Sequence, residues 1–245
     1  HMILAEQVLK FSFSAEFMEM FRVVIQLGAI LAVVVLYFKK LWPFCADNGR
    51  DSGFSRHLRW PVVRLWCKII VACVPAAVLG LLLDDWLDAH LYNSVTVALM
   101  LIIYGIAFIL IERRPRVPTT TKLSRITYKQ ALIVGGWQVL ALIPGTSRSG
   151  STIIGGLLCG MSRPAASQFT FFLAIPVMAG ASGLKLVKYL AKGGVFTLAE
   201  TSALLVGCIV AFVVSMLAIR FLMNYVKKHT FTAFGWYRIV LGIVV

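Results

Sequence analysis

The sequence predicts an all-α, polytopic integral membrane protein with about six spanning helices, at least one re-entrant helical hairpin, and inverted repeats. Of its 245 residues, 60% are hydrophobic and only 14% are charged, whereas a soluble domain is usually about half apolar and a quarter charged. The basic residues also fall in short clusters between long apolar runs. We therefore treat residues 1–245 as a single transmembrane domain.

Six apolar runs approach the length that lets a helix cross a bilayer, which is about 20 residues. All are slightly short and rich in small residues, which favours close helix packing in a bundle. The five cysteines show no C-x-x-C spacing, so we find no metal or disulfide signature. The runs are residues 23–38, 69–83, 95–111, 169–184, 203–219 and 231–245.

The charges between these runs predict an orientation. Segments 39–68 and 112–129 are basic, whereas the loop predicted at 84–94 has three aspartates and no lysine or arginine. The positive-inside rule places the two basic loops in the cytoplasm and the acidic loop outside. Basic loops of this kind face anionic headgroups, so the net charge of +14 does not require nucleic acid as a partner.

Residues 131–162 cannot cross the bilayer in the same way, because two short apolar arms flank the polar break "PGTSRSGST" at 144–152. Irregular backbone is tolerated at membrane depth only where protein or a water-filled cavity covers it, so the pattern predicts a re-entrant hairpin. Broken segments of this kind often mark binding sites and occur in inverted pairs. We therefore predict a first repeat at 1–111 and a second repeat at 131–245, which contains the hairpin.

The break has the chemistry of a phosphate site. Arg148 would cost about 2.5–3.5 kcal/mol in the hydrocarbon region, and its planar fork matches two phosphate oxygens. Ser147, Ser149 and Thr152 add hydroxyl groups, and Gly150 lets backbone amides approach an anion at a helix start. Alternatively, these hydroxyls cap a broken helix, as Thr152 could at its start, and Arg148 binds helix-end carbonyls. That alternative does not explain why the charge is tolerated.

The motif at 144–152 resembles the second signature of the bacterial undecaprenyl-diphosphate phosphatase family of the bacitracin-resistance type, P-G-x-S-R-S-x-x-T. The stretches "VIQLGAILAVV" and "FLAIPVMAGA" are also similar to that family. The resemblance implies hydrolysis of undecaprenyl diphosphate to undecaprenyl phosphate, which recycles the peptidoglycan carrier lipid and confers bacitracin resistance. It further implies a multi-pass protein of the bacterial cytoplasmic membrane, with a site open to the outside, where Ser147, Arg148 and Thr152 bind phosphate.

The family's first signature has a glutamate pair followed by P-x-S-S-T-G-H, and only its end is similar here. "HMILAE" resembles the sequence that begins at the motif histidine, which would be His1. In the alternative interpretation, His1-Met2 is a cloning scar. The resemblance implies that the first hairpin is mostly missing, together with glutamates that would share a Mg²⁺ or Ca²⁺ ion, whose ligands we cannot name. On this interpretation the chain binds lipid diphosphate weakly and hydrolyses it negligibly.

In the mechanism that we expect, Arg148, Ser147 and amides near Gly150 hold the terminal phosphate of a lipid diphosphate. A hydroxyl or a water attacks in line, and His1 moves the proton. Ser147 is the less favoured nucleophile because no base lies near it in the sequence. Gln138 resembles a glutamine that many family members have, and it binds either phosphate or the backbone of the hairpin arm.

Two functions without hydrolysis stay open at this point. A transporter or flippase for an anionic polyprenyl phosphate lipid would also use inverted repeats with broken helices. A scaffold or receptor would bind lipid diphosphates and do no chemistry. Phosphate release separates an enzyme from both, and the oligomeric state is not predicted.

Overall fold

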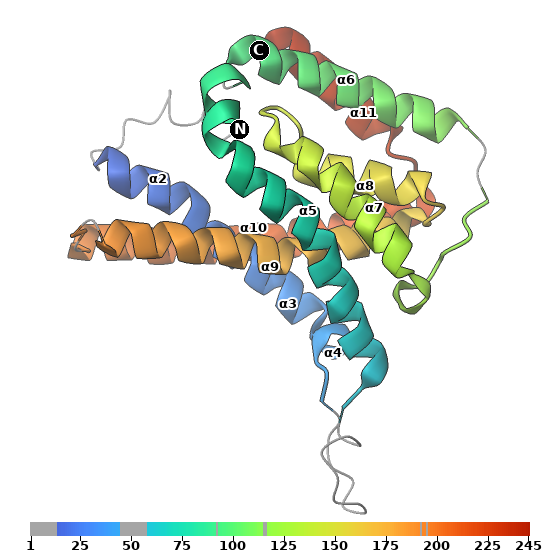
Figure 1. Cartoon of the computed structure of the whole chain (residues 1–245), viewed down its shortest axis with the longest axis horizontal. Coiled ribbons are helices and arrows are strands. Elements are labelled where there is room, and N and C mark those ends of the chain that lie inside the picture. Colours follow the sequence, from blue (N-terminus) through green and yellow to red (C-terminus); the bar gives the residue numbers. More distant parts are fainter. Residues whose placement is uncertain (1–13, 45–57, 92, 115–116, 192, 195) are drawn as a thin grey trace, which may run out of the picture. The chain divides into compact units, whose positions relative to one another are not determined.

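In a computed structural model, the chain is predominantly helical (Figure 1). The structure describes residues 14–44, 58–91, 93–114, 117–191, 193–194 and 196–245. Within these ranges the only extended pairings are two isolated bridges, Phe44 with Leu58 and Thr120 with Met161. The all-α prediction is therefore confirmed.

The helices follow one another in this order: α2 (Ala15–Val24), α3 (Gln26–Leu36), α4 (Phe38–Leu41), α5 (Trp60–Leu91), α6 (Ser94–Arg113), the 3₁₀ turn η2 (Leu123–Arg125), α7 (Tyr128–Val139), the 3₁₀ turn η3 (Leu140–Leu142), α8 (Arg148–Leu158), α9 (Arg163–Ala191), α10 (Leu198–Lys228) and α11 (Thr232–Val244).

Within the described part of the chain, five helical stretches are long and apolar enough to cross a membrane: Glu16–Leu36, Trp60–Leu83, Ser94–Arg113, Arg163–Ala191 and Leu198–Lys228. The sixth predicted span is α11, which is apolar but has only 13 residues. Large hydrophobic side chains are exposed along these helices; Leu81, for example, is 81% exposed. Lipid, not water, stabilises such a surface. The protein is a polytopic membrane protein.

The acidic segment 84–94 is not the loop that the sequence suggested. Helix α5 continues through Leu91, because residues 83–91 contain no glycine or proline to end it. The connection to α6 is short, and Asn93 caps α6 by accepting a hydrogen bond from the Thr96 amide at 2.8 Å.

The chain divides into two compact units. The first comprises residues 1–38 and 174–221, and the second comprises residues 39–173 and 222–245. The predicted repeats at 1–111 and 131–245 concern internal symmetry, which this division does not address, so the inverted repeat stays a prediction.

In the first unit, α2 and α3 pack on residues of α9 and α10. Phe17, Met20 and Val24 form its buried core. The Ser182 hydroxyl of α9 donates to the Val23 carbonyl at 3.0 Å. On the α10 side, Gly28 lies against the Cys208 carbonyl, so the absence of a side chain lets the two backbones approach closely.

The second unit contains the predicted hairpin, and its helices also meet through small residues. Helices α6 and α11 lie side by side, as do α7 and α8 (Figure 1). Gly105 of α6 faces Gly235 and Ile239 of α11. Gly135 of α7 faces the backbone of Ala72 in α5. Close contacts of this kind hold α7 at a fixed position beside α5.

The Gly135→Ala variant is expected to lose about 2 kcal/mol of stability, a typical cost of overpacking. A Cβ at Gly135 would lie 2.9 Å from the Ala72 Cα, and only a backbone shift relieves that contact. The adjacent Gly136 has nothing within 4 Å of an added Cβ, so Gly136→Ala should be neutral or slightly stabilising. Unfolding of the two variants in detergent measures the difference. Equal stabilities would contradict the close α5–α7 packing.

Candidate active site

The chain breaks sharply between α7 and α8, and two residues explain the break. Pro144 favours extended backbone at the residue before it, and Ile143 has φ −75° and ψ 124°. Gly145 follows with a φ of +85°, which glycine adopts at little cost. A Cβ at Gly145 would also meet the Val97 Cα of α6 at 2.6 Å. The turn is thus fixed against the first turn of α6.

The residues before α7 and the residues after α8 lie next to each other, near the C-terminal end of α6. The Thr119 and Thr120 amides donate to the Gly160 carbonyl at 2.9 and 3.1 Å, and the Ser162 amide donates to the Thr120 carbonyl at 2.9 Å. These bonds join the residues before α7 to those after α8. The segment therefore leaves where it enters, as a re-entrant hairpin requires.

The N-cap and first turn of α8 contain four of the predicted site residues, Ser147, Arg148, Ser149 and Gly150. Ser147 is the N-cap, and its Oγ accepts from the Gly150 amide at 3.2 Å. Arg148 and Ser149 begin the helix, and both are half-buried. A helix start presents backbone N–H groups and partial positive charge. The hydroxyl proton of Ser147 is not used by its capping bond, so this group can still donate to an anion.

Thr152 lies inside α8 and is not its cap. Its hydroxyl donates to the Arg148 carbonyl at 2.9 Å and to the Ser149 carbonyl at 3.2 Å. It also accepts from the Thr170 hydroxyl of α9 at 3.0 Å, and the residue is 1% exposed. Of the two roles left open for Thr152, capping of the helix start is not seen, since Ser147 is the N-cap of α8. The predicted phosphate contact of Thr152 stays a prediction, because the hydroxyl here connects the first turn of α8 to α9.

Two buried polar side chains next to the break have no hydrogen-bond partner in the described structure. Gln138 is 2% exposed, and neither its amide oxygen nor its amide nitrogen is bonded. The Thr146 hydroxyl is likewise buried and unbonded. Buried polar groups are nearly always hydrogen-bonded, so both point to a polar ligand or water at the break. The alternative role for Gln138, binding the backbone of the hairpin arm, is not seen.

A second arginine, which sequence analysis missed, reaches the break from α11. The Arg238 guanidinium donates from Nη2 to the Gly145 carbonyl at 3.1 Å and lies 5.7 Å from the centre of the Tyr104 ring. Its Nη1 lies against Gly150, 2.7 Å from where a Cβ would be. Arg238 is 8% exposed, and its Nε has no partner. A charge within the apolar tail 231–245 was the signal that could have identified it.

The tyrosine beneath Arg238 also helps to hold α8. The Tyr104 hydroxyl of α6 lies 3.2 Å from the Ser151 hydroxyl, and Ser151 donates to the Trp137 carbonyl of α7. Ser151 is fully buried. These contacts connect α6, α7 and α8 directly behind the first turn of α8, so that turn is rigidly supported.

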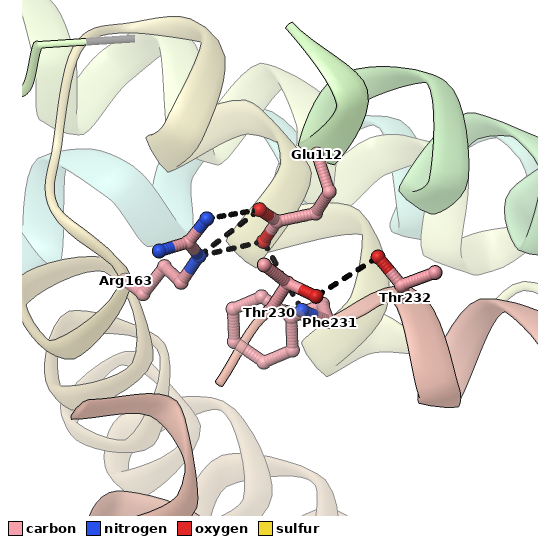
Figure 2. A network of polar contacts seen from close by, with 5 residues as sticks. All are labelled: Glu112, Arg163, Thr230, Phe231 and Thr232. Atoms are coloured by element: carbon pink, nitrogen blue, oxygen red, sulfur yellow. Dashed lines mark hydrogen bonds and ion pairs between the residues drawn. The ribbon is translucent and has the colours of Figure 1, made fainter. Parts of the chain in front are cut away.

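A polar cluster at the other end of α6 fixes the starts of α9 and α11 (Figure 2). The Glu112 carboxylate is 4% exposed and pairs with Arg163, whose Nε donates to its two oxygens at 2.9 and 3.0 Å. The same carboxylate accepts from the Phe231 amide at 3.2 Å. Phe231 immediately precedes α11, so Glu112 anchors the helix that carries Arg238.

Glu112→Gln should lower stability by about 2 kcal/mol, because a largely buried carboxylate that accepts several charge-assisted bonds would be lost. A matched control is Glu19→Gln, which breaks the exposed pair with Lys185 and should cost less than about 0.5 kcal/mol. Thermal unfolding of both variants tests the difference. A Glu112→Gln protein as stable as the control would show that the cluster does not anchor α11.

Two further predictions concern His1 and a bound metal ion. His1 lies outside the described residues, so its proposed role in proton transfer stays a prediction. In the ranges that the structure describes, no group of three or more His, Cys, Asp or Glu could hold a metal ion. The implied Mg²⁺ or Ca²⁺ therefore stays a prediction, and we assign no step to a cation.

Comparison with known proteins decides the family. The family model of the bacitracin resistance protein BacA matches residues 1–244. The chain belongs to the BacA family. The resemblance predicted from the 144–152 motif is thereby confirmed.

Three proteins similar to this chain are each named undecaprenyl-diphosphatase. The chain is 58% identical over 246 residues to an undecaprenyl-diphosphatase of Enterococcus faecalis, covering 100% of this chain and 87% of that protein. It is 56% identical over 251 residues to one of Desulfitobacterium hafniense and 54% identical over 247 residues to one of Streptococcus thermophilus. Those matches cover 100% of this chain and 86% and 84% of the two relatives.

Proposed function

We propose that this protein hydrolyses undecaprenyl diphosphate to undecaprenyl phosphate and inorganic phosphate, and that the break between α7 and α8 holds the phosphate that is released. Family membership over residues 1–244 and relatives named undecaprenyl-diphosphatase support the reaction. The activity returns the carrier lipid to peptidoglycan synthesis and confers bacitracin resistance. Those names do not favour the transporter alternative.

One observation supports the place of the phosphate most strongly. Arg148 begins α8, and Arg238 reaches the same turn from α11, where its guanidinium binds the Gly145 carbonyl and lies against Gly150. A buried cation therefore lies beside the start of α8. An arginine in an apolar surrounding needs an anionic or strongly polar partner, and the Nε of Arg238 has none among the described residues. The unbonded side chains of Gln138, in α7, and Thr146, in the break itself, are further polar groups that a ligand could bind.

The chain's own residues would act on the terminal phosphate as follows. The Arg148 guanidinium, the Ser147 hydroxyl, and the backbone amides of Arg148 and Ser149 bind its oxygens and the charge that develops on them. Either water attacks the terminal phosphorus in line and gives inorganic phosphate directly, or a hydroxyl attacks and water then hydrolyses the phosphoester that forms. In both cases the bond from that phosphorus to the bridging oxygen breaks. Undecaprenyl phosphate leaves with the electron pair. His1 is proposed to take the proton of the nucleophile.

Phosphate release tests the reaction. Protein that contains these 245 residues together with the first signature motif of the family is purified, supplied with undecaprenyl diphosphate, and assayed for inorganic phosphate. We expect release that a nonspecific phosphatase inhibitor does not abolish. Movement of the lipid across a bilayer without phosphate release would instead support the transporter.

We also propose that the protein lies in the bacterial cytoplasmic membrane with the site facing outside. The hairpin ends lie near the Glu112 end of α6, next to the basic segment 112–129, and the turn at Gly145 lies against Val97 near the start of α6. Helix α6 is about 30 Å long at 1.5 Å per residue, so the turn is close to the bilayer surface opposite the basic loops. The positive-inside rule places that surface outside.

Cysteine labelling checks this orientation. A cysteine at Ser94, exposed at the start of α6, should react with an impermeant thiol reagent in intact cells, in a background without native cysteines. One at Lys129, exposed in the first turn of α7 at the basic end, should react only after the membrane is opened. The reverse labelling would place the site on the cytoplasmic side.

A further inference from the structure

A cavity of about 360 Å³ lies at the basic-loop end of the second unit and shares no lining residue with the break between α7 and α8. Residues near the end of α4, the start of α5, the η2 turn and the start of α9 form its walls. Three cationic side chains line it: Lys40, Arg59 and Lys122. None of the described residues that line it is acidic.

Hydrogen bonds hold two of these cations in place. The Arg59 Nη1 donates to the Lys39 carbonyl at 2.7 Å, and the Arg59 amide donates to the Pro43 carbonyl at 2.6 Å. The Lys40 Nζ donates to the Gln168 amide oxygen of α9 at 3.1 Å. An arginine has several N–H donors, so Arg59 can bind a further acceptor besides the Lys39 carbonyl.

Neutral donors and an apolar floor complete the cavity. Thr121 and Ser124 add hydroxyl groups beside Lys122. Val62, Leu65 and Ala165 lie beneath and are at most 6% exposed. A cationic rim over an apolar floor matches a phosphate that is attached to hydrocarbon, whereas a free phosphate ion would gain nothing from the floor.

Aromatic residues place the cavity at the depth of lipid headgroups. Trp42 and Trp60 are 47% and 55% exposed on the segments that carry Lys40 and Arg59. Tyr128, at the start of α7, is 49% exposed. Exposed tryptophan and tyrosine are enriched where a bilayer meets water. Basic pockets between helices at that level recognise anionic lipid headgroups.

We infer that this cavity binds the phosphate group of an anionic phospholipid, with Lys40, Arg59 and Lys122 as its charged donors. The site is separate from the proposed catalytic site. Its occupant would be a membrane lipid bound at the opposite end of α6 from the turn at Gly145.

Binding of phosphatidylglycerol to the purified chain, followed by native mass spectrometry, tests this inference. The test variant is Lys40→Gln/Lys122→Gln, which leaves the backbone contacts of Arg59 intact. The control variant is Arg113→Gln/Lys129→Gln, which removes two exposed cations from the same end of the molecule but none from the cavity. The cavity variant should bind at least about tenfold more weakly, and the control at most about twofold more weakly.

Three further binding measurements separate a specific lipid site from general charge attraction. Lys122→Gln alone, at an exposed position, should weaken binding by about threefold without loss of fold. Phosphatidylcholine should bind weakly to every variant, because its headgroup has no net charge. Millimolar inorganic phosphate should not displace phosphatidylglycerol. Equal loss in the cavity and control variants would overturn the inference, as would binding of inorganic phosphate without binding of the lipid.

Discussion

Replacing Arg148 by lysine is expected to lower phosphate release by about a hundredfold or more, which corresponds to roughly 3 kcal/mol of lost transition-state stabilisation. A guanidinium can bind two phosphate oxygens in one plane, whereas an ammonium cannot reproduce that geometry. Folding and membrane insertion should survive, because lysine keeps the charge and most of the length. The measurement is initial-rate phosphate release at saturating undecaprenyl diphosphate.

Arg113→Lys is the matched control for this change. Arg113 is the last residue of α6 and is exposed, and it is not part of the break. The control should keep nearly full turnover. Near-normal turnover in the Arg148→Lys protein would mean that Arg148 does not bind the reacting phosphate.

Gly150→Ala is expected to lower turnover by about tenfold or more with little change in stability. An added Cβ would lie 2.7 Å from the Arg238 Nη1 and 3.3 Å from Phe108. The nearest atom is the far end of a flexible side chain, so the guanidinium can move away at a small cost. A shift of even about 1 Å in a group that stabilises charge can reduce the rate greatly.

Gly136→Ala controls for the general effect of adding a methyl group to a helical glycine, since nothing lies within 4 Å of its Cβ position. It should keep both turnover and unfolding temperature. If the Gly150→Ala protein unfolds at a clearly lower temperature, its loss of turnover is explained by disturbed packing. If it is stable and fully active, Arg238 has no role in the reaction.

The sequence predicted the break between α7 and α8 well, because its causes are local. Pro144 and Gly145 interrupt the helix wherever they stand, and an arginine beside hydroxyl groups in an apolar segment requires a partner. The helical class followed equally directly from the length and polarity of the apolar runs. These signals need no knowledge of tertiary structure.

Other features depended on the register of a helix or on distant contacts. Once α8 begins at Arg148, Thr152 is four residues along, and a threonine there can bond the backbone of the preceding turn. The sequence alone did not predict that α8 begins at Arg148. Arg238 is 93 positions away from Gly145 in the chain, and only the packing of α11 on α6 brings the two together.

The extent of α5 was missed for a third reason. Three aspartates after residue 83 suggested a solvated loop. Polar residues alone do not end a helix, however, and segment 83–91 has no glycine or proline to end it. The burial of the two unbonded side chains, Gln138 and Thr146, was also difficult to predict from the sequence. Gln138 was noted because it resembles a glutamine of the family, whereas nothing in the local sequence marked Thr146 as buried.

The most direct test of the central claim is a structure of the protein with a non-hydrolysable undecaprenyl diphosphate analogue whose bridging oxygen is replaced by a methylene group. The account predicts the terminal phosphoryl group at the break between α7 and α8, with its oxygens within hydrogen-bond distance of the Arg148 guanidinium and the first-turn amides of α8. A terminal phosphoryl group bound elsewhere, with Arg148 bonded only to protein carbonyls, would contradict it.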